Sequence, residues 1–390
     1  MIKYDELVSR AVKEAPPSGI RKFFDMLADM DDVVALTVGQ PDFVTPWHIR
    51  EAAIESLEKG KTYYTSNSGM PELRCEISNY LKRRFNVSYD PKDEVVVTVG
   101  GSEAIDLAIR AVINIGEGDE VIVPTPSFVC YAPLVSMAGG VPVILETRPE
   151  DKFKITPEQL ERLITPKTKM LVLPYPNNPT GAIMTREELE KIADVLRDKN
   201  ILVLSDEIYA EMTYTGTHTS FATLPDMAER TILVSGFSKS YAMTGWRLGY
   251  LCAPKPIAKQ ILKLHQYAIM CAPTVSQFAA IEALKNGDED IEFMTAEYNR
   301  RRTFIYEGLR DIGIDSFEPE GAFYIFPHIG KFGLSSEKFC ERLIYEKKCA
   351  IVPGTAFGAG GEGYARISYA YSVKHIEQAL ERIEDFVKTL

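Results

Sequence analysis

Short, almost wholly apolar runs recur along the middle of this chain, each separated from the next by a helical pattern. The runs are Glu94–Thr98, Glu120–Val123, Met170–Leu173, Ile201–Leu204 and Ile232–Val234. They lack the alternation of apolar and polar residues typical of a half-exposed strand, so they predict strands buried on both faces. Amphipathic stretches such as Glu103–Asn114 and Thr185–Lys199 lie between them. This repetition predicts an α/β fold whose large domain has a mostly parallel central sheet covered by helices.

The last third of the chain has a different pattern, in which long helical stretches enclose a few short strands. We expect helices at Ile291–Asp311, Ser335–Lys347 and Val373–Lys388, and strands at Ala322–Phe326 and Ala365–Tyr369. These elements predict a smaller α+β C-terminal domain. We place its boundary near Ala283–Asp288.

Charge and cysteine usage limit the partners of the chain. With 55 acidic and 44 basic residues the net charge is −11, which argues against nucleic acid or an anionic membrane as a partner. The N-terminus shows no signal-peptide pattern, and no apolar run reaches the roughly 18 residues of a membrane span. The six cysteines form no CxxC pair, and the histidines form no HExxH or Cys/His cluster. We expect a cytoplasmic protein with reduced thiols and no metal site.

The segments after the predicted strands indicate where a ligand would bind. In open parallel sheets, ligands bind beyond the carboxyl ends of the strands. The segments found there are VGGSE, PTPSFVCY, PYPNNPTG, SDEIY and SGFSKSYAMTGWRLG. One rim of the sheet should therefore collect backbone amides, an aromatic ring, an Asn, an Asp, a Tyr and a Lys.

Lys239 stands out because it follows a strand inside a stretch of small and apolar residues. Desolvation and neighbouring cations lower the pKa of such an amine and make it a nucleophile for carbonyl groups. Arg247, eight residues further on, suits a phosphate dianion. Gly100-Gly101-Ser102 joins a strand to a helix and offers free amides to an anion, although alone it is equally typical of a tight turn.

Five motifs together resemble the fold-type-I, class I/II aminotransferases, and most closely the subgroup of aspartate, aromatic and N-acetyl-diaminopimelate aminotransferases. The motifs are VGQPDF, YPNNPTG, SDEIY, SGFSKSYAMTGWRLG and GYARISYA. The resemblance covers essentially the whole chain in the family's order. It implies an enzyme dependent on pyridoxal 5'-phosphate (PLP), a transferase of amino-acid metabolism. It also implies a large PLP-binding domain at 45–284, a small domain formed by 1–44 and 285–390, and a homodimer with its active site at the subunit interface.

The resemblance assigns roles around the cofactor ring. Lys239 would hold PLP as a Schiff base and, once freed, act as general base. Asp206 would pair with the ring nitrogen, and Asn178 and Tyr209 would hydrogen-bond the phenolic oxygen. Phe128 would stack on the ring face. Taken singly these residues could be structural, since Asp206 could cap a turn and the aromatic residues could belong to the core.

Further residues would hold the cofactor's phosphate. By resemblance these are the amides of Gly101, Ser102 and Glu103, the guanidinium of Arg247, and Tyr64 reaching the neighbouring subunit's phosphate. The chain departs from the family at Gly236, where many relatives have a serine three residues before the lysine. Ser238 or Ser235 could supply the hydroxyl, or it could be missing; we favour Ser238.

Substrate binding would rest on Arg366, which matches the arginine that clamps the α-carboxylate, with Asn178 and the Gly39 backbone closing over the same group. No second arginine for a side-chain carboxylate can be assigned. Arg21, Arg110 or a residue of the other subunit are candidates.

The implied reaction is ping-pong transfer of an α-amino group from an L-amino acid (aspartate, aromatic or related) to a 2-oxo acid such as 2-oxoglutarate. A C–S β-lyase or a cyclopropane-carboxylate synthase on the same scaffold is the open alternative. A PLP-scaffold transcriptional regulator is disfavoured, because VGQPDF ends at residue 43 and leaves no room for a DNA-binding domain before it. Gly358–Gly363 matches GxGxxG, but it precedes a predicted strand and opens no helix, which indicates a tight or mobile loop.

Overall fold

A seven-stranded sheet forms the centre of the computed structural model, which describes residues 2–15, 17, 19, 26 and 30–390. Its strand order is β2-β8-β7-β6-β5-β3-β4. The bounds are β2 Val95–Thr98, β3 Glu120–Thr125, β4 Val141–Glu146, β5 Thr168–Leu173, β6 Leu202–Asp206, β7 Thr231–Gly236 and β8 Gly249–Cys252. β8 pairs antiparallel with both of its neighbours, β2 and β7, and all the other pairs in this sheet are parallel. The five predicted strands are present, and the predicted α/β class is confirmed.

The two strands of this sheet that the pattern did not predict are β4 and β8, and each was missed for a physical reason. β4 (VPVILE) lies at the sheet edge and is largely exposed or half-buried. Its run is apolar but contains Pro142, and a proline inside such a run argues against a strand except at a sheet edge. β8 contains only four residues and follows the SGFSKSYAMTGWRL segment directly. Its short apolar run therefore reads as the end of that motif.

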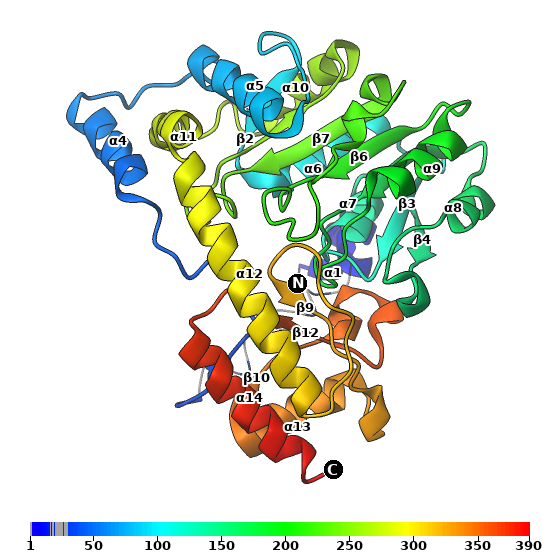
Figure 1. Cartoon of the computed structure of the whole chain (residues 1–390). Coiled ribbons are helices and arrows are strands. Elements are labelled where there is room, and N and C mark those ends of the chain that lie inside the picture. The colour runs from blue at the N-terminus through cyan, green and yellow to red at the C-terminus, as the bar shows by residue number, and fades with distance from the viewer. Residues whose placement is uncertain (1, 16, 18, 20–25, 27–29) are drawn as a thin grey trace.

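Helices cover both faces of the sheet, which explains the uniformly apolar strands. Val96 packs with α6 (Gly100–Val112), α7 (Tyr131–Met137) and α10 (Lys255–Ala268). Its neighbours in the strand, Val95 and Val97, pack on the other face with α4, α5 and α11. Those helices span Trp47–Glu58, Pro71–Phe85 and Thr274–Asn286. On the same face, α8 (Pro157–Leu163) and α9 (Arg186–Leu196) continue the helical layer over β5 and β3 (Figure 1).

The C-terminal third forms a separate core around a small antiparallel sheet. The 24-residue helix α12 (Asp288–Asp311) leads into it from α11 (Figure 1). The sheet order is β11-β12-β9, and α13 and α14 complete the unit. Their bounds are β9 Tyr324–Ile325, β11 Val352–Pro353, β12 Ala365–Ser368, α13 Ser336–Lys347 and α14 Val373–Val387. The predicted smaller α+β region is therefore present.

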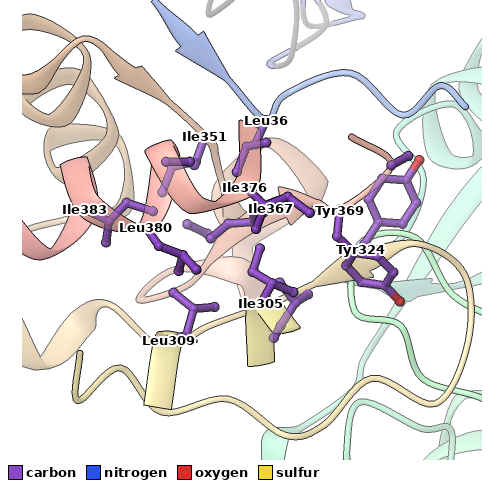
Figure 2. Packing of buried hydrophobic residues seen from close by; sticks show 14 of the residues in the cluster. Leu36, Ile305, Leu309, Tyr324, Ile351, Ile367, Tyr369, Ile376, Leu380 and Ile383 are labelled. Atoms are coloured by element: carbon purple, nitrogen blue, oxygen red, sulfur yellow. The ribbon is translucent and has the colours of Figure 1, made fainter. Parts of the chain in front are cut away.

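Two parts of the N-terminal segment lie in different surroundings. β1 (Val34–Ala35) pairs in parallel with β10 (Cys349–Ala350), and Leu36 joins the C-terminal core (Figure 2). Residues 10–15 instead border a cavity beside α7. The division into domains at 45–284, and at 1–44 with 285–390, stays a prediction.

The glycine-rich segment that matches GxGxxG forms a tight turn. Ala359–Gly361 is a single 3-10 turn that leads into β12. A Cβ at Gly358 would lie 2.9 Å from the Thr125 side chain, so the turn packs closely against the end of β3. The segment opens no α-helix and therefore lacks the geometry of a dinucleotide site. Within the described residues, no helix is both long and apolar enough to cross a membrane, and no group of three metal-ligating side chains is assembled.

Leu309→Ala should destabilise the protein by about 2–5 kcal/mol, because it leaves a cavity in the C-terminal core, where this side chain is 1% exposed (Figure 2). Urea unfolding of the purified variant measures the loss. Leu7→Ala, at a side chain that is 75% exposed, is the control and should change stability by less than about 0.5 kcal/mol. Equal losses in the two variants would contradict the packing described here.

Candidate active site

A cavity of about 310 Å³ lies beyond the carboxyl ends of the parallel strands, where the sequence predicted a ligand site. Segments following β2, β3, β5, β6 and β7 all reach it, and residues from the two ends of the chain complete it. Its volume falls within the roughly 300–1,000 Å³ typical of small-molecule sites. The predicted residues that line it are Gly39, Gly101, Ser102, Phe128, Asn178, Asp206, Tyr209, Ser238, Lys239, Arg247 and Arg366.

Lys239 is half-buried directly after β7, and its Nζ donates a hydrogen bond to the Gly39 carbonyl at 2.5 Å. The aromatic rings of Tyr209 and Phe323 lie 5.9 and 5.7 Å from Nζ. Burial lowers the pKa of Lys239 to about 8, and the positive charges of Arg366 and Arg247 act in the same direction. A substantial fraction of this amine is therefore neutral and nucleophilic near physiological pH.

Asp206 lies at the end of β6 and is only 7% exposed. The Tyr131 hydroxyl donates to Oδ2 at 2.7 Å, and the Ile208 amide donates to Oδ1 at 3.2 Å. Burial raises the pKa of Asp206, while these two hydrogen bonds and the charge of Lys239 oppose that rise. A cationic group placed in the cavity beside Asp206 would relieve the cost of burying the carboxylate.

Arg366 reaches the cavity from β12 and is 2% exposed. Its Nη1 donates to Asn178 Oδ1 at 3.0 Å and its Nη2 donates to the Thr37 carbonyl at 2.5 Å. The guanidinium carbon lies 4.6 Å from the centre of the Tyr324 ring. Nε is buried and has no hydrogen-bond partner among the described residues, and a buried unpaired donor is costly. The arrangement suits an anionic ligand, and above all a carboxylate.

Two tyrosines of the cavity were not identified from the sequence. Tyr324, on β9, shares a hydrogen bond of 2.8 Å between its hydroxyl and that of Tyr209. It lies in a predicted strand, where a tyrosine is interpreted as a core residue, so no local sequence signal could have identified it as a cavity residue. Tyr131 belongs to the quoted segment PTPSFVCY, and its position after a strand was the one available indication.

The part of the cavity wall formed by Gly101, Ser102 and Arg247 is suited to an anion bound by backbone amides. Gly101 and Ser102 lie in the first turn of α6, where amides lack partners within the helix. A Cβ at Gly100, which has a φ of +78°, would lie 2.6 Å from Arg247 Nη2. Glu103 turns its side chain away from this part of the wall, because Oε1 contacts His265 Nδ1 at 2.7 Å and Oε2 accepts from the Val99 amide at 2.5 Å.

Close packing explains why position 236 is a glycine. A Cβ there would lie 2.9 Å from the Gly249 Cα and 3.1 Å from the Leu248 carbonyl oxygen, because β7 and β8 pair closely at this point. Ser238 lines the cavity, whereas the Ser235 hydroxyl donates to the Glu207 carbonyl at 3.4 Å. Of the two candidates for a phosphate hydroxyl, the structure brings Ser238 to the cavity.

Three further predicted residues lie away from the cavity or outside the described residues. Tyr64 is 77% exposed, and its contact with another subunit stays a prediction. Arg110 does not line the cavity; it is exposed on α6, where its Nε bonds Asp106 at 2.8 Å. Arg21 lies outside the described residues.

Gly236→Ser should lower the free energy of unfolding by about 1–3 kcal/mol, since its Cβ would force β7 and β8 apart. Chemical denaturation of the variant tests this. Gly245→Ser, at a glycine whose added Cβ would meet no heavy atom within 4 Å, is the matched control and should leave stability nearly unchanged. An unaffected Gly236→Ser variant would refute the steric explanation.

Comparison with known proteins agrees with this geometry. The sequence pattern of the family described as Aminotransferase class I and II matches residues 31–383. The aspartate aminotransferase of Pyrococcus abyssi is 44% identical over 95% of this chain and 96% of that protein. An aromatic aminotransferase structure from Pyrococcus horikoshii has a TM-score of 0.89 and 43% identity, covering 95% of this chain and 99% of that one.

A second solved structure, the aspartate aminotransferase of Thermus thermophilus with maleate, has a TM-score of 0.92 and 39% identity, covering 98% of this chain and 99% of that one. The sequence pattern, the relatives and the solved structures agree over nearly the full length. The chain therefore belongs to the aminotransferase class I and II family.

Proposed function

We propose that this aminotransferase depends on PLP and moves an α-amino group from an L-amino acid (aspartate, aromatic or related) to a 2-oxo acid such as 2-oxoglutarate. The observation that carries the proposal is that the Lys239 amine and the Asp206 carboxylate line one buried cavity. The relatives and structures named above are aspartate and aromatic aminotransferases, which supports this substrate range. Those names also favour transamination over the alternative C–S β-lyase.

The residues of the cavity fit PLP at both of its charged ends. Asp206 is buried and hydrogen-bonds no charged group of the described residues, so it suits a protonated ring nitrogen. The first turn of α6, Ser238 and Arg247 suit the phosphate. Phe128 would cover the ring, and Tyr209 and Asn178 would bind its phenolic oxygen. When bound, PLP supplies an electron sink that stabilises negative charge at the substrate's α-carbon.

The remaining steps belong to the protein's own residues. Arg366, which lines the cavity, would bind the substrate's α-carboxylate through its guanidinium, while Asn178 and the Gly39 backbone would orient the same group. The Nζ of Lys239 would take the proton from the substrate's α-carbon as a general base and deliver a proton to the cofactor's former carbonyl carbon as a general acid. Among the described lining residues, Lys239 carries the sole primary amine. Because donor and acceptor use one site in turn, the kinetics would be ping-pong.

The proposal includes a cytoplasmic homodimer. The aromatic side chains of Tyr63, Tyr64 and Tyr267 are 63%, 77% and 93% exposed, and exposed aromatic residues are enriched in subunit contacts. In a homodimer, Tyr64 would reach the neighbouring subunit's phosphate. The six cysteines are all free, which supports a reducing compartment.

Lys239→Ala should reduce transamination at least about a thousandfold, because it removes both the attachment amine and the general base. The assay pairs a panel of amino donors with 2-oxoglutarate and reads kcat/KM for each. Lys255→Ala, at an exposed lysine paired with Asp93, is the control and should keep its activity. Near-normal turnover by Lys239→Ala would exclude the proposal, and pyruvate with ammonia formed without an acceptor would indicate the lyase.

The apoprotein should capture PLP covalently at a rate that depends on the protonation of Lys239. Only the neutral amine attacks a carbonyl, and burial lowers the pKa of Lys239 to about 8. Below pH 8 the rate should rise about tenfold per pH unit, and above pH 8 it should level off. Stopped-flow absorbance after mixing apoprotein with PLP measures this profile. A rate that keeps rising to about pH 10, as for an ordinary lysine, would contradict a desolvated amine.

A further inference from the structure

Tyr131 contacts the central acid of the site, although no role was assigned to it from the sequence. Its hydroxyl donates to Asp206 Oδ2 at 2.7 Å, and its side chain is 2% exposed. An ionised carboxylate only accepts hydrogen bonds, so this hydroxyl must point its proton at Asp206. Hydrogen bonds of this charge-assisted kind are short and stronger than neutral ones.

The position of Tyr131 is tied to that of Phe128, the predicted stacking residue. Tyr131 is the first residue of α7, and Phe128 precedes it by one turn. Their rings meet edge to face, with centroids 6.1 Å apart and planes at 83°. Both line the cavity. The short segment after β3 therefore supplies both Phe128, the ring that would cover the cofactor, and Tyr131, the hydroxyl that donates to Asp206.

The other groups around Asp206 that favour its ionised form do so less than Tyr131 does. The Ile208 amide gives a longer bond of 3.2 Å, and the charge of Lys239 is the smallest of the influences on its pKa. The negative charge of Glu207 acts against ionisation. Glu207 faces away from the cavity, where it accepts bonds from Ser205, Ser220 and His218 at 2.7–2.8 Å. Among the described residues, Tyr131 is the one side chain that donates directly to Asp206.

We propose that Tyr131 is a positioning residue that keeps the Asp206 carboxylate ionised and oriented toward the cofactor's ring nitrogen. This inference rests on the proposed PLP dependence. It predicts that Tyr131 contributes to PLP affinity only through the ring nitrogen. A residue that merely packs against the ring would contribute whether or not that nitrogen is present.

Binding of two ligands to Tyr131→Phe apoprotein tests the proposal. One is PLP and the other is 1-deazapyridoxal phosphate, which has CH in place of the ring nitrogen. The variant should bind PLP about ten- to a hundredfold more weakly, the usual cost of a hydrogen bond to a charged group. Its affinity for the deaza analogue should change less than about threefold. Equal weakening for both ligands, or no weakening, would overturn the proposal.

Tyr89→Phe is the matched control, because Tyr89 is also buried but its hydroxyl has no hydrogen-bond partner among the described residues. It should leave both affinities unchanged. If wild-type apoprotein bound PLP no better than the deaza analogue, Asp206 would not recognise the nitrogen and the proposal would fail. If wild-type protein bound neither ligand, the proposed PLP dependence itself would fall as well.

A second readout needs no cofactor. Since burial raises the folded-state pKa of Asp206, the stability linked to this group is fully present below its unfolded pKa. That stability is lost as the pH rises through the folded pKa. Removing the Tyr131 hydroxyl raises the folded pKa further, so the difference in Tm between wild-type and Tyr131→Phe apoprotein should be larger at pH 8 than at about pH 4, near the unfolded pKa of an aspartate. A difference that is the same at both pH values would contradict a role in ionisation.

Discussion

The site depends on holding an amine and a carboxylate in one cavity largely removed from water. Burial lowers the pKa of Lys239 and raises that of Asp206, so each group is shifted toward its neutral form. The shift suits Lys239, because an amine must be neutral to attack a carbonyl group. It does not suit Asp206, because the carboxylate must stay ionised to pair with a protonated ring nitrogen. The hydrogen bonds from Tyr131 and Ile208 favour the ionised form of Asp206 and so oppose the effect of burial on its pKa.

The antiparallel strand β8 contributes to the site as well as to the sheet. It lies between β2 and β7, so it places Gly249 against the turn at Gly100 and Gly101. A Cβ at Gly249 would lie 2.6 Å from backbone atoms of that turn, and a Cβ at Gly236 would lie 2.9 Å from the Gly249 Cα. Close backbone packing at these glycines brings Arg247 beside the first turn of α6. The same packing excludes a serine at position 236.

Much of the fold and of the candidate site could be predicted, because short local segments of the sequence specify it. The strands are apolar on both faces, and the residues that follow them carry Asn178, Asp206 and Lys239 to one rim. Tyr324 and Tyr131 could not be assigned, because a tyrosine in a predicted strand or after a turn is most often a core residue. Arg110, considered for a side-chain carboxylate, forms an ion pair on the outer surface of α6, and spacing alone could not reveal that orientation.

The sequence by itself determined the alternation of strands and helices along the chain. It also determined which kinds of side chain meet at the carboxyl ends of the strands. Both follow from periodicities and motifs only a few residues long. The tertiary structure alone decided how Arg366 and Gly39 enter the cavity from opposite ends of the chain, and which hydroxyl contacts Asp206. Those contacts join residues far apart in sequence, such as Arg366 with Asn178 and Lys239 with Gly39. Their geometry is set by the packing of two cores rather than by any local pattern.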